Sequence, residues 1–164
     1  MAVITGAGSG IGRAIAHKFA ANGASVCILD VNRTHAETVA AEITRAGGTA
    51  SAYECDVSDS VSIGSTFHTI SQKGRVYILV NNAGVSHIGN VESTTEEEFD
   101  RVFRINVKGY FNCINAVIGT MKSAGGGVIL NMASVAGSAG LADRFAYSTS
   151  KGAVIAMTYS VARD

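Results

Sequence analysis

A tyrosine and a lysine stand four residues apart near the end of the chain, in the segment YSTSK (147–151). On a helix this spacing places both side chains on the same face. Tyrosine has an unperturbed pKa near 10, so it is a slow acid or base at neutral pH, and a neighbouring ammonium group lowers that pKa. The pair Tyr147 and Lys151 therefore suits general acid–base catalysis. Chance alone also produces Tyr-x-x-x-Lys in many helices, so the pair needs support from the rest of the chain.

A glycine-rich segment near the start of the chain, TGAGSGIG (5–12), joins a short apolar run to a predicted helix. Glycines in such a turn let the backbone approach a pyrophosphate, toward which the helix points its first amide groups. The spacing is not G-x-G-x-x-G, because Ile11 stands where that pattern has a glycine, and a tight connection without a ligand would use similar residues. We predict that the turn binds a cofactor phosphate. The residues concerned are Gly6, Ser9, Gly10, Ile11 and Gly12.

Asp30 ends the next predicted strand, eighteen residues after Gly12. In dinucleotide-binding folds an acidic residue at this place bonds the hydroxyls of the adenosine ribose. Its charge would repel the 2′-phosphate of NADP, and Ser9 supplies no basic group for that phosphate. We therefore expect NAD rather than NADP, although Arg33 lies nearby in the sequence and could soften the preference.

Short apolar runs alternate with helical patterns along the whole chain. The expected strands are 1–5, 24–30, 50–57, 75–84 and 126–134. The expected helices are about 10–22, 34–46, 60–73, 95–122 and 147–163. This alternation predicts βαβ units, and so an α/β fold with a doubly wound parallel sheet (a Rossmann fold) in a single domain, 1–164. The segments SDS (58–60) and STTEEEF (93–99) have the composition of helix starts.

The composition is that of a globular protein, with 47% hydrophobic and 16% charged residues. Thirteen basic residues balance thirteen acidic ones, so no basic surface is expected to recruit nucleic acid or membranes. The first residues do not form a signal peptide, and we expect a cytoplasmic protein. The three cysteines and four histidines are scattered, which predicts buried free thiols and no metal site.

Together the motifs resemble those of the short-chain dehydrogenase/reductase family along essentially the whole chain. The family's T-G-x-x-x-G-x-G turn is the segment 5–12, and its Asp-Val pair after the third strand is the segment 56–57. Its N-N-A-G motif after the fourth strand is the segment 81–84. The resemblance implies that the aspartate caps the adenine region and that both motifs bind the cofactor. The residues concerned are Asp56, Val57, Asn82, Ala83 and Gly84.

The same resemblance implies a catalytic tetrad of Asn106, Ser134, Tyr147 and Lys151, with Ser134 thirteen residues before Tyr147 as in the family. Tyr147 would exchange a proton with the substrate oxygen, and Ser134 would donate a hydrogen bond to it. Lys151 would also bond the nicotinamide ribose, so that Tyr147 and Lys151 count among the cofactor contacts. Asn106 would relay protons through Lys151 and water, although a buried helical asparagine more often bonds backbone groups.

The resemblance implies an NAD(P)-dependent oxidoreductase that interconverts a secondary alcohol and a ketone by hydride transfer. Long-chain epimerases and dehydratases share Tyr-x-x-x-Lys, but Ser9 stands where their glycine turn has its middle glycine, so the simple dehydrogenase branch is favoured. His87 and Arg144 are candidate substrate contacts. We hypothesise that Arg144 favours an acidic or polyhydroxyl substrate, against the simpler interpretation of a solvated loop arginine.

Members of the family continue after the Tyr-Lys helix into two more strands and a substrate-binding loop, whereas this chain ends at SVARD (160–164). We therefore expect a fragment that lacks the last strands of its sheet and leaves an open sheet edge. Family members commonly form dimers or tetramers, so the resemblance implies a homodimer or homotetramer with a small-molecule substrate. The alternative is a non-catalytic dinucleotide-binding or interaction module.

Overall fold

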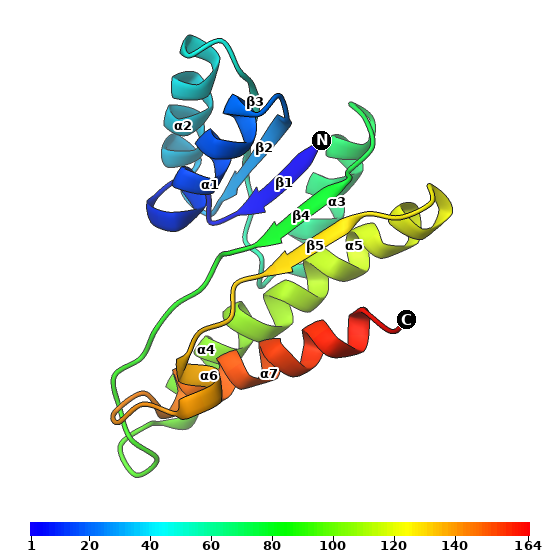
Figure 1. The fold of residues 1–164 in the computed structure, drawn as a ribbon. Helices are drawn as coiled ribbons and strands as arrows, with labels where there is room; N and C mark the ends of the chain where they lie inside the picture. The colour runs from blue at the N-terminus through cyan, green and yellow to red at the C-terminus, as the bar shows by residue number, and fades with distance from the viewer.

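Five parallel strands form the central sheet of the computed structural model, which describes residues 1–164 (Figure 1). The strands lie in the order β3-β2-β1-β4-β5. Their bounds are β1 Ala2–Thr5, β2 Ser25–Asp30, β3 Thr49–Glu54, β4 Ile78–Asn81 and β5 Val128–Asn131. The predicted α/β fold with a parallel sheet is thus confirmed. The strand order reverses at β1 and β4, which places the ligand crevice of such folds at the carboxyl ends of these two strands.

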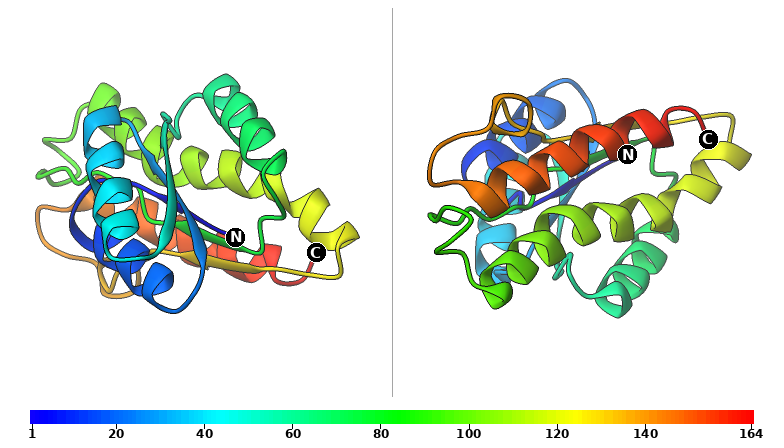
Figure 2. Two further views of the ribbon diagram at one scale, coloured as in Figure 1. Left: turned by 90° about the horizontal axis from the view of Figure 1, so that it is seen from above. Right: turned by 90° about the horizontal axis from the view of Figure 1, so that it is seen from below.

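Helices cover both faces of this sheet (Figure 2). Their bounds are α1 Gly10–Ala21, α2 Arg33–Arg45, α3 Ser60–Ser71, α4 Glu96–Phe103, the π-helical turn η1 Arg104–Lys108, α5 Gly109–Ser123, α6 Ala136–Ala139 and α7 Phe145–Val161. α1 and α2 pack on one face, and α3 and α5 pack on the other. None of the helices combines the length and the apolar character needed to cross a membrane.

Strand residues supply the core to both helical layers in alternation, because successive side chains of a strand point to opposite faces. On β2, Val26 and Ile28 pack with α1 and α2, whereas Cys27 and Leu29 pack with α3 and α5. All four side chains are essentially buried, and each buried aliphatic side chain contributes about 1.5–3 kcal/mol. Burial on both faces explains why β2 is a continuous apolar run in the sequence.

Side-chain caps fix the starts of two predicted helices. Asp59 accepts a hydrogen bond from the Val61 N–H at 2.9 Å at the start of α3. Thr95 accepts one from the Glu98 N–H at 3.3 Å at the start of α4, whose first turn is acidic. Both caps satisfy amides that have no partner inside the helix, and both confirm the predicted helix starts.

The helix predicted over 95–122 is not continuous. α4 ends at Phe103, the π-helical turn η1 follows, and α5 begins at Gly109. α5 starts close against the loop after β3, since a Cβ at Gly109 would lie only 2.8 Å from Val57 Cγ2. Asn106 lies inside η1, in keeping with the tendency of single π turns to occur at functional sites.

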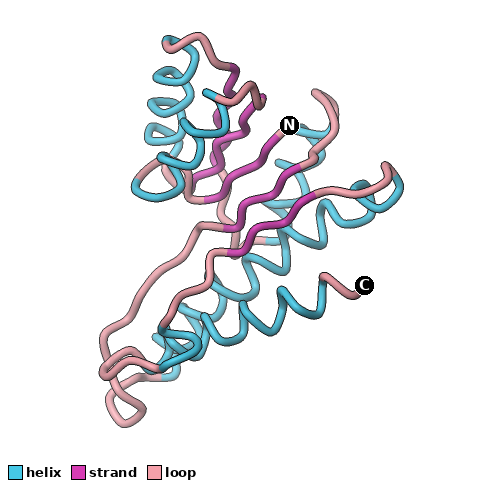
Figure 3. Tube along the Cα trace, in the orientation of Figure 1, coloured by secondary structure: helices cyan, strands magenta, loops and turns pink.

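Two long loops leave the carboxyl ends of β4 and β5 and meet near the start of α7 (Figure 3). The Gly89 N–H donates to Asp143 O at 3.0 Å, and the Phe145 N–H donates to Gly89 O at 3.0 Å. Gly89 and Arg144 therefore form an isolated parallel bridge. This bridge fixes the entry to α7, which begins two residues before the predicted start at Tyr147.

β5 forms an open edge of the sheet, because it pairs with β4 on one side and with no strand on the other. Val128 and Leu130 of this strand are 48% and 43% exposed. An edge of this kind presents unpaired backbone groups and apolar side chains. The open edge matches the expectation from the sequence.

Candidate active site

Asp30 holds the glycine turn between β1 and α1 in shape. The Gly8 N–H donates to Asp30 Oδ2 at 2.9 Å, and the Asn32 N–H donates to Asp30 Oδ1 at 2.9 Å. Gly6 and Gly10 have φ angles of 60° and 51°, in the left-handed region that glycine adopts without strain. The end of β2 and the glycine turn are thus one rigid unit.

The glycine turn also brings backbone close to neighbouring groups. A Cβ at Gly8 would lie 2.8 Å from Asp30 Oδ2, and a Cβ at Gly12 would lie 2.6 Å from Asn82 Nδ2. The first amides of α1 have no acceptor inside the helix, and the side chain of the N-cap residue Ser9 does not bond them. Free amide donors at the positive end of a helix dipole are the arrangement that binds phosphate.

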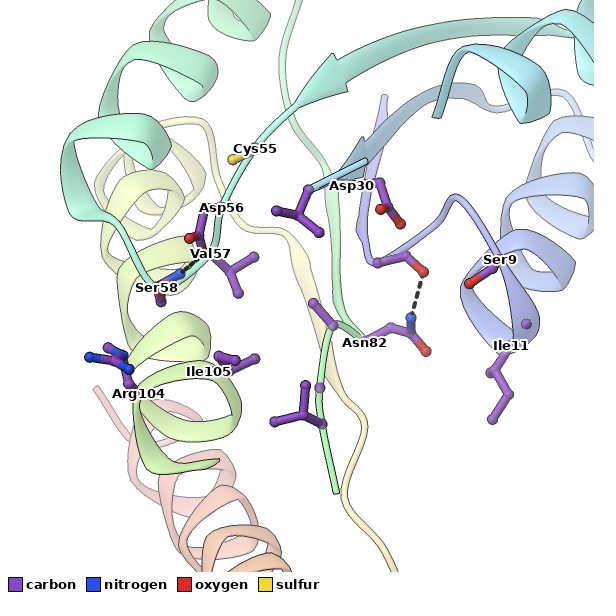
Figure 4. A pocket seen from close by; sticks show the side chains of 16 residues that line it. Ser9, Ile11, Asp30, Cys55, Asp56, Val57, Ser58, Asn82, Arg104 and Ile105 are labelled. Atoms are coloured by element: carbon purple, nitrogen blue, oxygen red, sulfur yellow. Dashed lines mark hydrogen bonds between the residues drawn. The ribbon is translucent and has the colours of Figure 1, made fainter. Parts of the chain in front are cut away.

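The N-N-A-G segment after β4 braces the glycine turn. Asn82 Nδ2 donates to Thr5 O at 2.9 Å. It also donates to Gly6 O at 3.1 Å (Figure 4). Thr5 Oγ1 accepts from the N–H groups of Asn82 and Ala83, both at 3.0 Å. The two motifs are far apart in the sequence, and these bonds fix their relative position.

A cavity of about 760 Å³ opens between the glycine turn, the end of β2 and the loop after β3 (Figure 4). Most of the predicted cofactor residues line it. They are Gly6, Ser9, Gly10, Ile11, Asp30, Asp56, Val57, Asn82, Ala83 and Gly84. The other three predicted contacts do not line it, because Gly12 faces Asn82 behind the turn, and Tyr147 and Lys151 lie on α7.

Six residues that no motif indicated also line the cavity. They are Val31, Cys55, Ser58, Val85, Arg104 and Ile105. The first four directly adjoin a predicted residue in the sequence, so adjacency to a motif indicates a position at the cavity. Arg104 and Ile105 come from the π turn. Ile105 adjoins the predicted residue Asn106, but the continuous helical pattern did not predict which side chains of this turn face the cavity.

Gly84 joins the cavity to a second group of polar residues. A Cβ at Gly84 would lie 3.1 Å from Asn106 Oδ1 and 3.7 Å from Lys151 Nζ. Gly84 itself lines the cavity. The absence of a side chain at this position therefore leaves room where the cavity meets the predicted catalytic residues.

Asn106 is fully buried and bonds its surroundings with all of its amide hydrogens. Its Nδ2 donates to Val85 O at 2.9 Å and to Ser150 Oγ at 3.0 Å, and its Oδ1 accepts from the Val85 N–H at 2.8 Å. Ser150 Oγ in turn donates to Tyr147 O at 2.7 Å. Asn106 thus connects the segment after β4 to the helix that carries Tyr147.

Lys151 is only 4% exposed, and its ammonium group is held by hydrogen bonds. Nζ donates to Met132 O at 2.6 Å and to the Tyr110 hydroxyl at 3.3 Å. Nζ lies 5.9 Å from the ring centre of Tyr147, so the predicted placement of the pair on one helical face is confirmed. Burial lowers the pKa of Lys151 from 10.5 to about 8, because desolvation disfavours the charged form.

Two hydroxyl groups in this part of the structure remain available to a ligand. Ser134 follows β5, and its Oγ accepts from the Ala136 N–H at 3.1 Å, which leaves its own O–H free to donate. Tyr147 is half-buried, and its hydroxyl forms no hydrogen bond within the chain. Both groups lie beyond the carboxyl ends of the strands, where open α/β sheets bind ligands.

The family model of short-chain dehydrogenases matches residues 1–164 of the chain. The protein belongs to the short-chain dehydrogenase family.

Its relatives include two polyol dehydrogenases. It is 37% identical over 165 residues to D-threitol dehydrogenase of Mycolicibacterium smegmatis, covering 100% of this chain and 64% of that protein. It is 42% identical over 164 residues to galactitol 2-dehydrogenase of Agrobacterium fabrum, covering 99% of this chain and 63% of that protein. The chain thus spans slightly less than two thirds of the length of these curated relatives.

The fold is also that of a solved family member. A crystal structure of a metagenomic short-chain oxidoreductase in complex with NADP matches with a TM-score of 0.94 and 35% sequence identity. The match covers 99% of this chain and 74% of that chain. The strand order and the helices described above are therefore those of a short-chain dehydrogenase.

The residues of this family member fit a dinucleotide on structural grounds of their own. The glycine turn lets backbone approach a pyrophosphate, and the first turn of α1 offers free amides. Asp30 lines the cavity where a ribose would lie. Arg33, the nearby basic residue, is paired instead with Glu37, at 2.7 Å on the exposed surface of α2.

The two candidate substrate contacts occupy loops that meet at the Gly89–Arg144 bridge. His87 Nδ1 lies 3.2 Å from Glu98 Oε2, and His87 Nε2 is buried without a hydrogen-bond partner. Arg144 Nη1 donates to Asp143 O at 2.9 Å, and no carboxylate lies within 4.0 Å of its guanidinium. The charge of Arg144 is therefore uncompensated at the entry to α7.

The chain has no cluster of three or more His, Cys, Asp or Glu side chains that could hold a metal ion. All three cysteines are free and buried, as predicted. Burial raises the pKa of Cys27 to about 11, which keeps this thiol protonated and unreactive at neutral pH.

Proposed function

We propose that the protein is an NAD-dependent dehydrogenase that interconverts a secondary alcohol and a ketone. The observation that carries the proposal is the junction at Gly84, where the dinucleotide cavity meets Asn106 and Lys151. α7 places the free hydroxyl of Tyr147 on the same helical face as the Lys151 ammonium. Family membership and the two polyol dehydrogenases among the relatives support the same class of reaction.

The proposed chemistry assigns the proton to Tyr147. NAD, when bound, accepts the hydride of the alcohol or, as NADH, supplies it to the ketone. In alcohol oxidation Tyr147 Oη takes the proton of the substrate hydroxyl, and in ketone reduction it returns that proton. Protonated Lys151 stabilises the phenolate by Coulomb attraction, which is stronger in a site removed from water. Ser134 donates its free O–H to the substrate oxygen as charge develops there.

We assign Asn106 a positioning role in this mechanism. Both hydrogens of its amide are already donated, to Val85 O and Ser150 Oγ. A side chain with no free donor is poorly suited to pass on a proton. Asn106 instead fixes the backbone next to Gly84 and, through Ser150, the first turn of α7.

Asp30 supports NAD as the cofactor. Its carboxylate lines the cavity, and a negative charge there would repel a 2′-phosphate. Arg33, which could offset that repulsion, is engaged by Glu37. The metagenomic relative was solved with NADP, and the proposal of NAD for this chain rests on the charge of Asp30. Calorimetric titration should give an affinity for NAD at least about tenfold above that for NADP, a difference of about 1.4 kcal/mol.

We propose a polyol as the alcohol. The names of the threitol and galactitol dehydrogenases support this class. The uncompensated guanidinium of Arg144 at the entry to α7 also supports it, because its hydrogen-bond donors suit a row of hydroxyl groups.

The test is reduction of NAD, followed by absorbance, over a panel of polyols, simple secondary alcohols and hydroxy acids. We expect turnover with polyols and its loss in Tyr147→Phe. NAD binding without turnover of any alcohol would favour a non-catalytic dinucleotide-binding module instead.

We further propose that the protein acts in the cytoplasm as a homodimer or homotetramer. Free, unpaired cysteines are usual in a reducing compartment. Phe111 of α5 is 55% exposed and lines, with Phe103 and Val107, a hollow on one face of the continuous α4–η1–α5 segment, an exposed apolar group that suits contact with a second copy. Light scattering coupled to size exclusion would give the oligomeric state, and Phe111→Glu should shift it toward the monomer.

A further inference from the structure

Tyr110 of α5 is a second tyrosine in the candidate active site, and no family motif led to it. It is 1% exposed. Its hydroxyl accepts a hydrogen bond from Lys151 Nζ at 3.3 Å and donates one to Met132 O at 3.3 Å. Met132 O also accepts from Lys151 Nζ at 2.6 Å. The phenol, the ammonium group and the carbonyl oxygen thus form a closed triangle of hydrogen bonds.

The ammonium group of Lys151 lies between two aromatic rings. Nζ is 5.2 Å from the ring centre of Tyr110 and 5.9 Å from that of Tyr147. No carboxylate lies within 4.0 Å of Nζ. A buried cation without a counterion needs other sources of stabilisation, and the negative face of an aromatic ring is one of them. Tyr110 therefore supplies both a hydrogen bond and a cation–π contact to a charge that has no ion pair.

The two tyrosines differ in what they can do. Burial raises the pKa of Tyr110, so this residue stays a neutral phenol throughout the range in which the protein would work. It is also out of reach of a substrate, since it is 1% exposed. Tyr147 is half-buried and has a free hydroxyl. Tyr110 is thus a partner of Lys151 and not an alternative acid.

We propose that Tyr110 is a positioning residue, which holds the Lys151 ammonium at Met132 O between the two tyrosine rings and keeps it charged beneath Tyr147. The proposal rests on the proposed function only for the importance of Lys151 in turnover. The placement and charge of Lys151 can be measured without any substrate or cofactor.

The groups that face Lys151 are few, which makes its titration interpretable. Tyr110 faces it from α5, Tyr147 from its own helix, and Asn106 from η1 with an uncharged amide. Cys113, a buried thiol one turn from Tyr110, is the nearest further titratable group on α5, and burial holds its pKa well above the usual range. Neither the phenol of Tyr110 nor this thiol ionises near the midpoint of Lys151. The titration is repeated in the Tyr147→Phe background, which removes the remaining ionisable phenol that faces Lys151.

The experiment follows the Cε resonance of Lys151 by NMR in protein labelled with ¹³C-lysine, over a pH titration. The chain has five lysines, so the signal that disappears in Lys151→Met is readily assigned. Tyr110→Phe keeps the ring and removes the hydroxyl, and should lower the midpoint of Lys151 by about one pH unit through loss of a hydrogen bond to the charged form. Tyr110→Leu removes the ring as well and should lower it further.

Tyr53→Phe is the matched control. Its ring lies under another lysine, with Lys73 Nζ 5.2 Å from the ring centre, but it is not in contact with Lys151. In the Tyr53→Phe variant, the titration midpoint of Lys151 should equal that of the wild type. A midpoint of Lys151 that stays unchanged in folded Tyr110→Phe would overturn the proposal, whatever Tyr110→Leu does.

Activity gives a separate reading. If the full-length protein turns over an alcohol, the pH profile of kcat in Tyr110→Phe should shift in the same direction as the NMR midpoint, while KM for NAD stays within about twofold. A shifted NMR midpoint in a protein that oxidises no alcohol would refute the proposed function and leave the role of Tyr110 standing. If the enzyme is active but the Lys151 midpoint is unshifted in Tyr110→Phe, the proposed function stands and the role of Tyr110 is refuted.

Discussion

Asn81 and Asn131 occupy paired positions of β4 and β5, and the side chain of Asn81 donates a hydrogen bond to Asn131 Oδ1 at 2.9 Å. Asn131 Nδ2 then donates to Thr158 Oγ1 at 3.0 Å on α7. Asn81 is fully buried. This row of polar side chains links β4 and β5 directly to the helix that carries Tyr147 and Lys151.

Asn131→Ala should therefore destabilise the protein by about 1–3 kcal/mol, because the buried amide of Asn81 loses its acceptor. Urea unfolding followed by circular dichroism gives the free energy of unfolding. Asn115→Ala is the control, since Asn115 is an exposed residue of α5. Equal stability of the two variants would show that the Asn81–Asn131 bond contributes nothing.

Asp30→Ala should exchange the cofactor preference. The substitution removes the acceptor for ribose hydroxyls and the charge that repels a 2′-phosphate, so NAD affinity should fall about tenfold or more while NADP affinity rises. It also removes the acceptor of the Gly8 N–H, so Asp30→Asn serves as the variant that keeps the shape of the side chain. Calorimetry with both cofactors is the measurement, and an unchanged NAD to NADP ratio in both variants would contradict the assignment of Asp30.

The parts of the fold that follow from local patterns could be predicted from the sequence. Continuous apolar runs predicted β1, β2 and β4, whose residues are largely buried on both faces of the sheet. The caps at Asp59 and Thr95 gave two helix starts, because a side chain bonds an amide two or three residues away. The glycine spacing and Asp30 likewise predicted the wall of the cavity that β1, α1 and β2 form.

Other parts depend on contacts between distant segments, and the sequence alone could not predict them. The π turn at Arg104–Lys108 interrupts a segment that has a continuous helical pattern, so Arg104 and Ile105 were not expected at the cavity. Tyr110 meets Lys151 only because α5 and α7 pack near the end of β5. The bonds of Asn106 to Val85 are of the same kind, and they favour a positioning role over the relay that the family resemblance implied.

Tyr147→Phe should lower kcat by about 10²- to 10⁴-fold, because the variant has no proton to exchange with the substrate oxygen. NAD affinity should change by less than about threefold, since the ring remains. Tyr159→Phe is the matched control on the same helix, where Tyr159 is 69% exposed. Stopped-flow absorbance of NADH measures the rate. Full activity in Tyr147→Phe would exclude Tyr147 as the acid–base group.

Arg144→Ala should raise KM for polyols by about tenfold, which corresponds to one lost hydrogen bond from a charged donor. Simple secondary alcohols, which have no further hydroxyl group to bond, should keep their KM. Arg45→Ala, an exposed arginine at the end of α2, should leave both substrate classes unaffected. If Arg144→Ala leaves the profile unchanged across acids, polyols and simple alcohols, the hypothesis that Arg144 selects the substrate is wrong.

The stability of the wild type relative to Lys151→Met should rise as the pH is raised from 8 to 10.5. Burial lowers the pKa of Lys151 from 10.5 to about 8, so the folded protein bears the full cost of the buried charge at every pH below 8. Between about pH 8 and 10.5 the unfolded chain binds more protons than the folded one, so wild-type stability rises with pH relative to the variant. At about 1.4 kcal/mol per pH unit, the total change is about 3 kcal/mol.

Urea unfolding of wild type and Lys151→Met from pH 7 to pH 10.5 measures this difference. Lys18→Met, at an exposed lysine of α1, is the control. The free energy of unfolding of this variant should differ from that of the wild type by the same amount at every pH in this range. If the difference between wild type and Lys151→Met did not change between pH 8 and 10.5, the midpoint of Lys151 would not be lowered in the folded protein. A difference that fell with pH would mean that the bonds to Met132 O and Tyr110 outweigh the desolvation of the ammonium group. The pH dependence of stability and the NMR titration thus test the same charge by independent means.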